Sequence, residues 1–234
     1  MKATRDDKDI LDKLEEFFDE KIQPKVKEIE KVLKKEIELG KLKPENLIEY
    51  DADSPFSYIT AFLGDKGVTS VAPSTKFLVD RTLKAMDLDE ASDIVEFGPG
   101  EGVMTRRILH AMPEDGKLIT IELNPHFART VRRIRDPRLR VVQGDVQEVE
   151  RHMERHGMAK ADVVVSGVPF SFFDPPDRHR LVEKIKSCLK PGGRFVAYQV
   201  TTHLIPVLKR HFKHVDGKLE LRNLPPHFVF RATD

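Results

Sequence analysis

The sequence has no tryptophan and only one cysteine among its 234 residues. A lone thiol cannot form a disulfide within the chain, which favours a reducing compartment, so we expect a cytoplasmic protein. Cys188 lies in an apolar helical pattern, and we expect it in the core rather than as a nucleophile. The chain also lacks a long apolar run, and its mean hydropathy is -0.42. These two features argue against a transmembrane helix.

An excess of one charge sign is missing as well. The 40 Lys and Arg residues nearly balance the 39 Asp and Glu residues, which leaves a net charge of +1. Nucleic-acid-binding domains usually carry a strong positive charge, so this balance does not predict nucleic acid as a partner. Basic residues do cluster between Arg129 and Arg140, where a phosphate-binding surface and a solvated helix face both fit; we favour the second.

The length suits one α/β domain with an appendage, and we place the boundary after residue 50. Residues 1–50 carry two apolar stripes at helical spacing, which predict an N-terminal helical extension. This extension fits three roles: packing on the domain or on another subunit, covering the active site, or lying on a membrane. The polar face of its first helix is mainly acidic, which disfavours an anionic membrane. Residues 51–234 then form the main domain.

The stretch from Asp93 to Met112 organises this domain. Residues 94–97 read as a short buried strand, three glycines follow within five residues, and residues 103–112 have apolar positions at helical spacing. Glycines at this turn let a ligand approach the backbone closely. A dinucleotide loop would have Gly or Ala where Val103 stands, and Glu101 would repel a pyrophosphate. The loop therefore suits a ligand with an adenosine and a positive centre.

The segment V-E-F-G-P-G-E-G, residues 95–102, resembles motif I of the class I S-adenosylmethionine (SAM) methyltransferases. This resemblance implies a Rossmann-like α/β fold, with a seven-stranded, mostly parallel sheet and helices on both faces. It also implies SAM as methyl donor, S-adenosylhomocysteine (SAH) as product, and no metal. His152 and His156 lie four residues apart on an expected helix without a third ligand nearby, so we interpret them as exposed helix positions.

Further motifs fall in the expected order along the chain. Glu122 ends a second strand about 20 residues beyond the glycine loop, where an acidic side chain accepts hydrogen bonds from ribose hydroxyls. Gly144-Asp145 resembles the motif that holds adenine, with Asp145 accepting from the exocyclic amine. We expect Ser74 to be the N-cap of the helix before motif I, and the resemblance implies that it also faces the SAM pocket. The cofactor-binding candidates are Ser74, Glu96, Gly98, Gly100, Gly102, Glu122, Leu123, Asp145, Val146 and Ser166.

The fourth strand, residues 161–166, is expected to deliver the loop that meets the methyl acceptor. The substrate-binding candidates are Gly167, Val168, Pro169 and Phe170. Methyltransferases that act on base amines have Asn or Asp before the proline and an aromatic residue after it, but this chain has Gly167 there. The V-S-G-x-P string and residues 222–230 instead resemble bacterial phosphatidylethanolamine N-methyltransferases. The resemblance to ribosomal RNA adenine dimethylases is more distant.

Three functions follow from these motifs. The first is SAM-dependent N-methylation of a phospholipid headgroup amine such as phosphatidylethanolamine, with a peripheral contact to the cytoplasmic membrane. The second is methyl transfer to RNA, protein or a small soluble metabolite, with nucleic acid disfavoured by the charge balance and by Gly167. The third is a SAM-binding interaction subunit without catalysis. The side chains considered as a general base are Tyr58, His203, Tyr198 and His179.

Overall fold

A computed structural model describes residues 74–223 and 226–234. The predicted N-terminal extension, the boundary after residue 50 and Tyr58 lie outside these residues. The elements alternate between helix and strand and then end in two strands. They are α4 (Lys76–Met86), β1 (Asp93–Phe97), α5 (Val103–Ala111), β2 (Lys117–Glu122), α6 (Pro125–Val131), β3 (Leu139–Gln143), η3 (Val146–Glu148), α7 (Val149–Arg155), β4 (Ala161–Ser166), η4 (Phe170–Phe172), α8 (Pro175–Cys188), β5 (Leu189–Gln199), α9 (Ile205–His211), β6 (His214–Glu220) and β7 (His227–Thr233).

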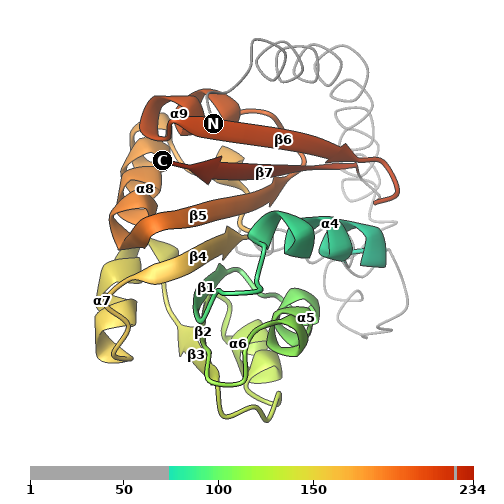
Figure 1. Ribbon diagram of the computed structural model, residues 1–234, viewed down its shortest axis with the longest axis vertical. Coiled ribbons are helices and arrows are strands. Elements are labelled where there is room, and N and C mark those ends of the chain that lie inside the picture. The colour runs from blue at the N-terminus through green and yellow to red at the C-terminus, as the bar shows by residue number, and fades with distance from the viewer. Residues whose placement is uncertain (1–73, 224–225) are drawn as a thin grey trace, which may run out of the picture. The chain divides into compact units, whose positions relative to one another are not determined.

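The strands form one sheet in the order β3-β2-β1-β4-β5-β7-β6 (Figure 1). Five neighbouring strands are parallel, and β7 runs antiparallel to both β5 and β6. The predicted seven-stranded, mostly parallel sheet is therefore confirmed. The strand order reverses between β1 and β4, which is the place where α/β sheets bind ligands beyond the carboxyl ends of their strands.

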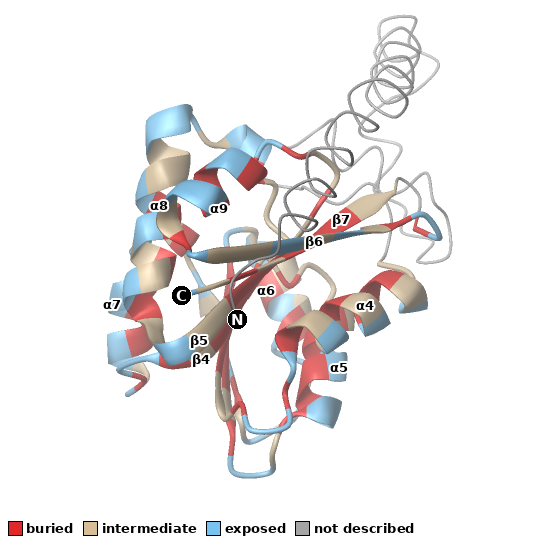
Figure 2. Cartoon of the chain, turned by 45° about the horizontal axis from the view of Figure 1, so that its top comes forward, coloured by how far each residue is buried: buried red, intermediate tan, exposed pale blue. Residues whose placement is uncertain are grey.

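Helices cover both faces of the sheet, as the sequence predicts. Figure 1 shows α4, α5 and α6 on one side and α7, α8 and α9 on the other. Buried residues concentrate in the strands between these layers (Figure 2). Ile94, Val95 and Phe97 of β1 are fully buried, as expected for a central strand, and Cys188 is also in the core. None of the helices in the described part of the chain combines the length and apolar character needed to cross a bilayer.

Several local predictions need correction. The N-cap of α4 is Thr75 rather than Ser74, because the Thr75 hydroxyl accepts the hydrogen bond from the Leu78 amide. Helix α6 ends at Val131, so most of the basic cluster lies in the turn that follows it. Residues 215–218 read Val-Asp-Gly-Lys, a sequence from which we expect a turn, but they belong to β6, since pairing with β7 supplies their backbone hydrogen bonds.

Candidate active site

The glycine loop lies at the carboxyl end of β1 and has an unusual backbone. Gly98, Gly100 and Gly102 all have positive φ, between 54° and 80°. A Cβ at Gly98 would lie 2.8 Å from a methyl carbon of Val168, so the absence of a side chain lets this loop meet the loop after β4. A Cβ at Gly100 would meet nothing within 4 Å, so this part of the loop faces open space. The loop thus offers its backbone to a ligand.

Glu122 lies at the carboxyl end of β2, beside the glycine loop. Its carboxylate accepts hydrogen bonds from the amides of Gly100, at 3.1 Å, and Asn124, at 2.9 Å. Burial raises the pKa of Glu122, and these backbone hydrogen bonds oppose the shift. Each carboxylate oxygen has two lone pairs, so the group can still accept hydrogen bonds from a ligand. Its location suits the predicted contact with ribose hydroxyls.

Glu96 is the most strongly buried carboxyl group of the site. One oxygen accepts a hydrogen bond from the Thr105 hydroxyl at 2.7 Å, and the other has no partner. Burial raises its pKa from 4.5 to about 8; the Thr105 hydrogen bond lowers it, and the charge of Glu122 adds to the increase. An unpaired buried carboxyl oxygen is costly. A ligand with positive charge, such as SAM, would therefore be stabilised beside it.

Asp145 caps the short helix η3 by accepting a hydrogen bond from the Gln147 amide at 2.8 Å. The imidazole of His152 contacts the Asp145 carbonyl at 3.1 Å and leaves no room for a side chain at Gly144. His152 is only 5% exposed, so the prediction of an exposed helix position is wrong for this residue. His152 instead supports the turn that carries Asp145.

The remaining cofactor candidates differ in exposure. Leu123 follows Glu122 and is 59% exposed, which leaves an apolar surface beside the ribose candidate. Val146 and Ser166 are buried, and the Ser166 hydroxyl accepts a hydrogen bond from the Val168 amide. Ser74 is half-buried at the residue before the cap of α4. Leu123, Val146 and Ser166 lie at or just after the carboxyl ends of β2, β3 and β4, while the contacts of Ser74 with SAM stay a prediction.

The loop after β4 is fixed by Gln199, a residue that the sequence motifs did not single out. The Gln199 side chain accepts a hydrogen bond from the Phe170 amide and donates to the Val168 carbonyl, both at 2.9 Å. Gln199 is buried at the carboxyl end of β5. The sequence signal that could have identified it is its position at the carboxyl end of a strand that neighbours β4. It holds the predicted acceptor loop in one conformation.

The ring of Phe170 lies in the core. It is 1% exposed and packs near the rings of Phe173 and Phe195. An aromatic ring that is buried in this way cannot stack on a methyl acceptor. Of the four predicted substrate-binding residues, Phe170 therefore contributes to the core, while Gly167, Val168 and Pro169 form the loop beside the glycine loop.

A second set of contacts joins the start of α4 to the turn between β6 and β7. The Thr75 amide donates to the Asn223 side chain at 2.9 Å, and Asn223 bonds the His227 ring at 3.0 Å. Glu220 pairs with both Arg81 and Arg222, at 2.8 and 2.7 Å. These two pairs hold the pKa of Glu220 down at about 2. Arg222, Asn223 and His227 thus lie at the same edge of the sheet.

The other predicted side chains are placed as follows. His203 is exposed on the connection between β5 and α9, and Tyr58 lies outside the described residues. His179 contacts His211 on the helices α8 and α9. Within the ranges that the structure describes, no group of three or more His, Cys, Asp or Glu side chains is placed to hold a metal ion.

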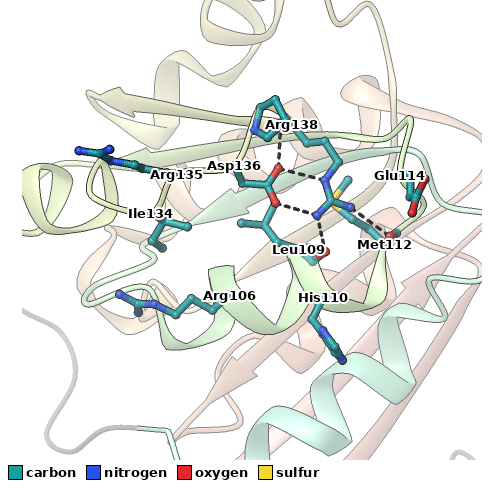
Figure 3. Close-up of a pocket in the computed structure, with 10 residues that line it drawn as sticks. Arg106, Leu109, His110, Met112, Glu114, Ile134, Arg135, Asp136 and Arg138 are labelled. Atoms are coloured by element: carbon teal, nitrogen blue, oxygen red, sulfur yellow. Dashed lines mark hydrogen bonds and ion pairs between the residues drawn. The ribbon is translucent and has the colours of Figure 1, made fainter.

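A cleft of about 600 Å³ lies elsewhere, along α5 and the turn before β3 (Figure 3). Arg138 occupies its wall and donates to the Asp136 carboxylate and to the carbonyls of Leu109, Met112 and Pro113. Its guanidinium therefore serves to fix the turn. The cleft extends toward the amino ends of β2 and β3, away from the edge that carries Glu96 and Glu122.

Comparisons with known proteins agree with this geometry. A family described as "Methyltransferase domain" matches residues 94–193. An ornithine lipid N-methyltransferase from Singulisphaera acidiphila is 33% identical over 166 residues, which span 68% of this chain and 84% of that protein. The chain belongs to the class I SAM-dependent methyltransferases.

Two further proteins are similar to this methyltransferase. A probable ribosomal RNA small subunit methyltransferase A from Pyrobaculum islandicum is 30% identical over 139 residues, covering 58% of this chain and 54% of that protein. The crystal structure of a precorrin-6y C5,15-methyltransferase from Geobacter metallireducens has a TM-score of 0.53 at 16% identity, covering 71% and 96% of the two chains. This last likeness confirms the fold. SAM is the methyl donor of the enzyme.

Proposed function

We propose that this methyltransferase transfers the sulfonium methyl of SAM to an amine in a lipid headgroup, such as that of phosphatidylethanolamine. The shape of the loop after β4 carries the proposal. Gly167 offers no side chain to bind the edge of a base, and the Phe170 ring is buried in the core. A loop without these two groups suits a small aliphatic amine better than a planar base.

The similarity to the ornithine lipid N-methyltransferase supports the same acceptor class, because that protein is matched over most of its length. The exposed apolar side chains give a second line of support. Among the described residues, the exposed large hydrophobic side chains are Leu123, Phe172 and Leu221. They follow β2, β4 and β6, whose carboxyl ends lie at one edge of the sheet. An apolar edge beside the acceptor loop suits a lipid substrate.

The reaction needs an uncharged amine, since its lone pair attacks the methyl carbon. An alkylammonium loses its proton more readily when it is buried, so a desolvated site supplies the neutral form. The methyl group then passes in line from sulfur to nitrogen. Catalysis of this kind depends mainly on orienting the two reactants and keeping water out. The competing function is methyl transfer from the same SAM site to RNA, protein or a soluble amine.

The test uses SAM with a labelled methyl group and the full chain. Phosphatidylethanolamine and ornithine lipid are offered separately in mixed micelles, next to total RNA and a low-molecular-weight extract. We expect label in the organic phase, on a headgroup amine, for one or both lipids. Label in the RNA or the aqueous extract without label in either lipid would contradict the proposal. Glu122→Ala, which removes a predicted SAM contact, serves as the inactive control.

A further inference from the structure

Tyr198, next to the carboxyl end of β5, lies directly over Gly167. A Cβ added to Gly167 would lie 2.2 Å from the Tyr198 hydroxyl oxygen and 2.6 Å from the ring carbon that bears it. No side chain at position 167 fits while the tyrosine ring holds this place. The hydroxyl thus fills the space into which a side chain at this position of the acceptor loop would extend.

This hydroxyl lies close to the predicted cofactor-binding residues. Gly167 adjoins the glycine loop, because a Cβ at Gly98 would come within 3.8 Å of the Gly167 backbone. Burial raises the pKa of Tyr198, and the charges of Glu96 and Glu122 raise it further. The phenol therefore stays protonated and lies within electrostatic reach of both carboxyl groups. Its hydroxyl forms no hydrogen bond with the residues that the structure describes.

The neighbours of Tyr198 hold it in place. The adjacent Gln199 binds the acceptor loop at Val168 and Phe170. On the other side, the ring of His227 lies 6.4 Å from the Tyr198 ring, centre to centre, and His227 is itself bonded to Asn223. A polar group on a rigid strand between two fixed neighbours can orient a ligand with little loss of entropy.

We propose that Tyr198 orients the acceptor amine: its phenolic oxygen accepts a hydrogen bond from the amine N–H and thereby aims the nitrogen lone pair at the sulfonium methyl. This inference rests on the proposed amine acceptor. As the N–C bond forms, the C–S bond breaks and its electron pair stays on sulfur, giving SAH. The positive charge moves to nitrogen, and the new ammonium releases a proton to water. Tyr198 acts as an acceptor of a hydrogen bond and not as the base.

The first test compares Tyr198→Phe with the wild type on three headgroups: a primary amine, its monomethyl form and its dimethyl form. A neutral dimethylalkylamine has no N–H to donate. We expect kcat/KM to fall about tenfold on the first two acceptors, and by less than about twofold on the third, as loss of one hydrogen bond predicts. An equal fall on all three would overturn the inference.

The second test needs no lipid. Sinefungin, a SAM analogue, carries an amino group in place of the sulfonium methyl, whereas SAH carries nothing there. We expect Tyr198→Phe to weaken sinefungin about tenfold and SAH by less than about twofold in calorimetric titrations. Gly167→Ala, which keeps the hydroxyl but displaces the ring, should also remove the preference for sinefungin.

The two tests separate this inference from the function on which it rests. If the wild type methylates neither lipid and Tyr198→Phe still loses its preference for sinefungin, the lipid function fails and the role of Tyr198 at the methyl position stands. If sinefungin and SAH weaken equally in the variant, or neither weakens, the role of Tyr198 is wrong even when the lipids are methylated. Thermal melting of each variant, compared with the wild type, detects loss of the fold.

Discussion

At the scale of single residues, the site combines two acidic side chains that differ in their environment. Glu122 is held by backbone amides of the glycine loop and of Asn124, which favour its ionised form. Glu96 has one hydrogen bond for two oxygens and a pKa of about 8, so it is mainly protonated at neutral pH. SAM brings a sulfonium and an ammonium group, which favour the carboxylate. Binding of SAM should therefore release a proton from Glu96.

This coupling makes the affinity for SAM depend on pH. Because the cationic groups of SAM favour ionised Glu96, the dissociation constant for SAM should fall about tenfold from pH 6 to pH 9. This change corresponds to a decrease of about one unit in the pKa of Glu96 when SAM binds. Glu96→Gln cannot ionise and should show a flatter profile. Calorimetric titrations in buffers of different ionisation enthalpy measure both the affinity and the protons released.

The exposed Glu148, which pairs with Arg151, gives the matched control, since Glu148→Gln should keep the wild-type slope. A wild-type slope in Glu96→Gln would contradict the prediction.

The free energy of unfolding should also depend on pH through the raised pKa of Glu96. The folded protein binds one proton more than the unfolded chain between pH 4.5 and about 8, so the free energy of unfolding should fall as the pH rises through this window.

At the scale of elements, Gln199 couples the end of β5 to the loop after β4. Gln199→Leu keeps the volume of the side chain but leaves the Phe170 amide and the Val168 carbonyl without their partner. We expect kcat to fall by at least about tenfold, because the acceptor loop loses its fixed position. SAM affinity should change by less than about threefold, since the glycine loop and Glu122 are untouched.

Single-turnover methylation and SAM titration separate these two effects. Thr130→Val is a suitable control, because it removes a hydrogen bond on the exposed face of α6. A parallel loss of SAM binding in Gln199→Leu would show that the residue supports the whole site rather than the acceptor loop alone.

The order of helices and strands was predictable from local patterns. The spacing of the apolar residues and the positions of the glycines predict β1, α5 and β2, because a buried strand and a tight turn each restrict which residue types fit at neighbouring positions. The burial of His152 and the contact between Tyr198 and Gly167 were not predictable, since each depends on residues that meet only after the sheet forms. The same holds for β6, whose middle looks like a turn until β7 pairs with it.

At the scale of the whole molecule, the carboxyl edge of the sheet carries both the site and the exposed apolar side chains. Phe172 is 53% exposed and Leu221 is 63% exposed. We expect the double variant Phe172→Ser, Leu221→Ser to bind phosphatidylethanolamine-containing vesicles at least about tenfold more weakly, because each apolar side chain gains free energy when it leaves water. Vesicle sedimentation measures the bound fraction.

The control is SAM affinity, which should stay unchanged in the double variant. Raising the salt concentration should also have little effect on vesicle binding by the wild type, since the net charge is only +1. Binding that disappears in high salt, or that the double variant retains, would contradict an apolar contact at this edge.

The close approach of Tyr198 to Gly167 has a consequence for how this enzyme can change. An asparagine at position 167 and a tyrosine at position 198 cannot occupy the same space. A descendant that acquired the asparagine first would have to displace the tyrosine ring. A descendant that first replaced the tyrosine with a smaller residue would pass through a form with neither polar group beside the loop. The two positions should therefore vary together among descendants, and selection on the acceptor would act on them as a single inherited unit.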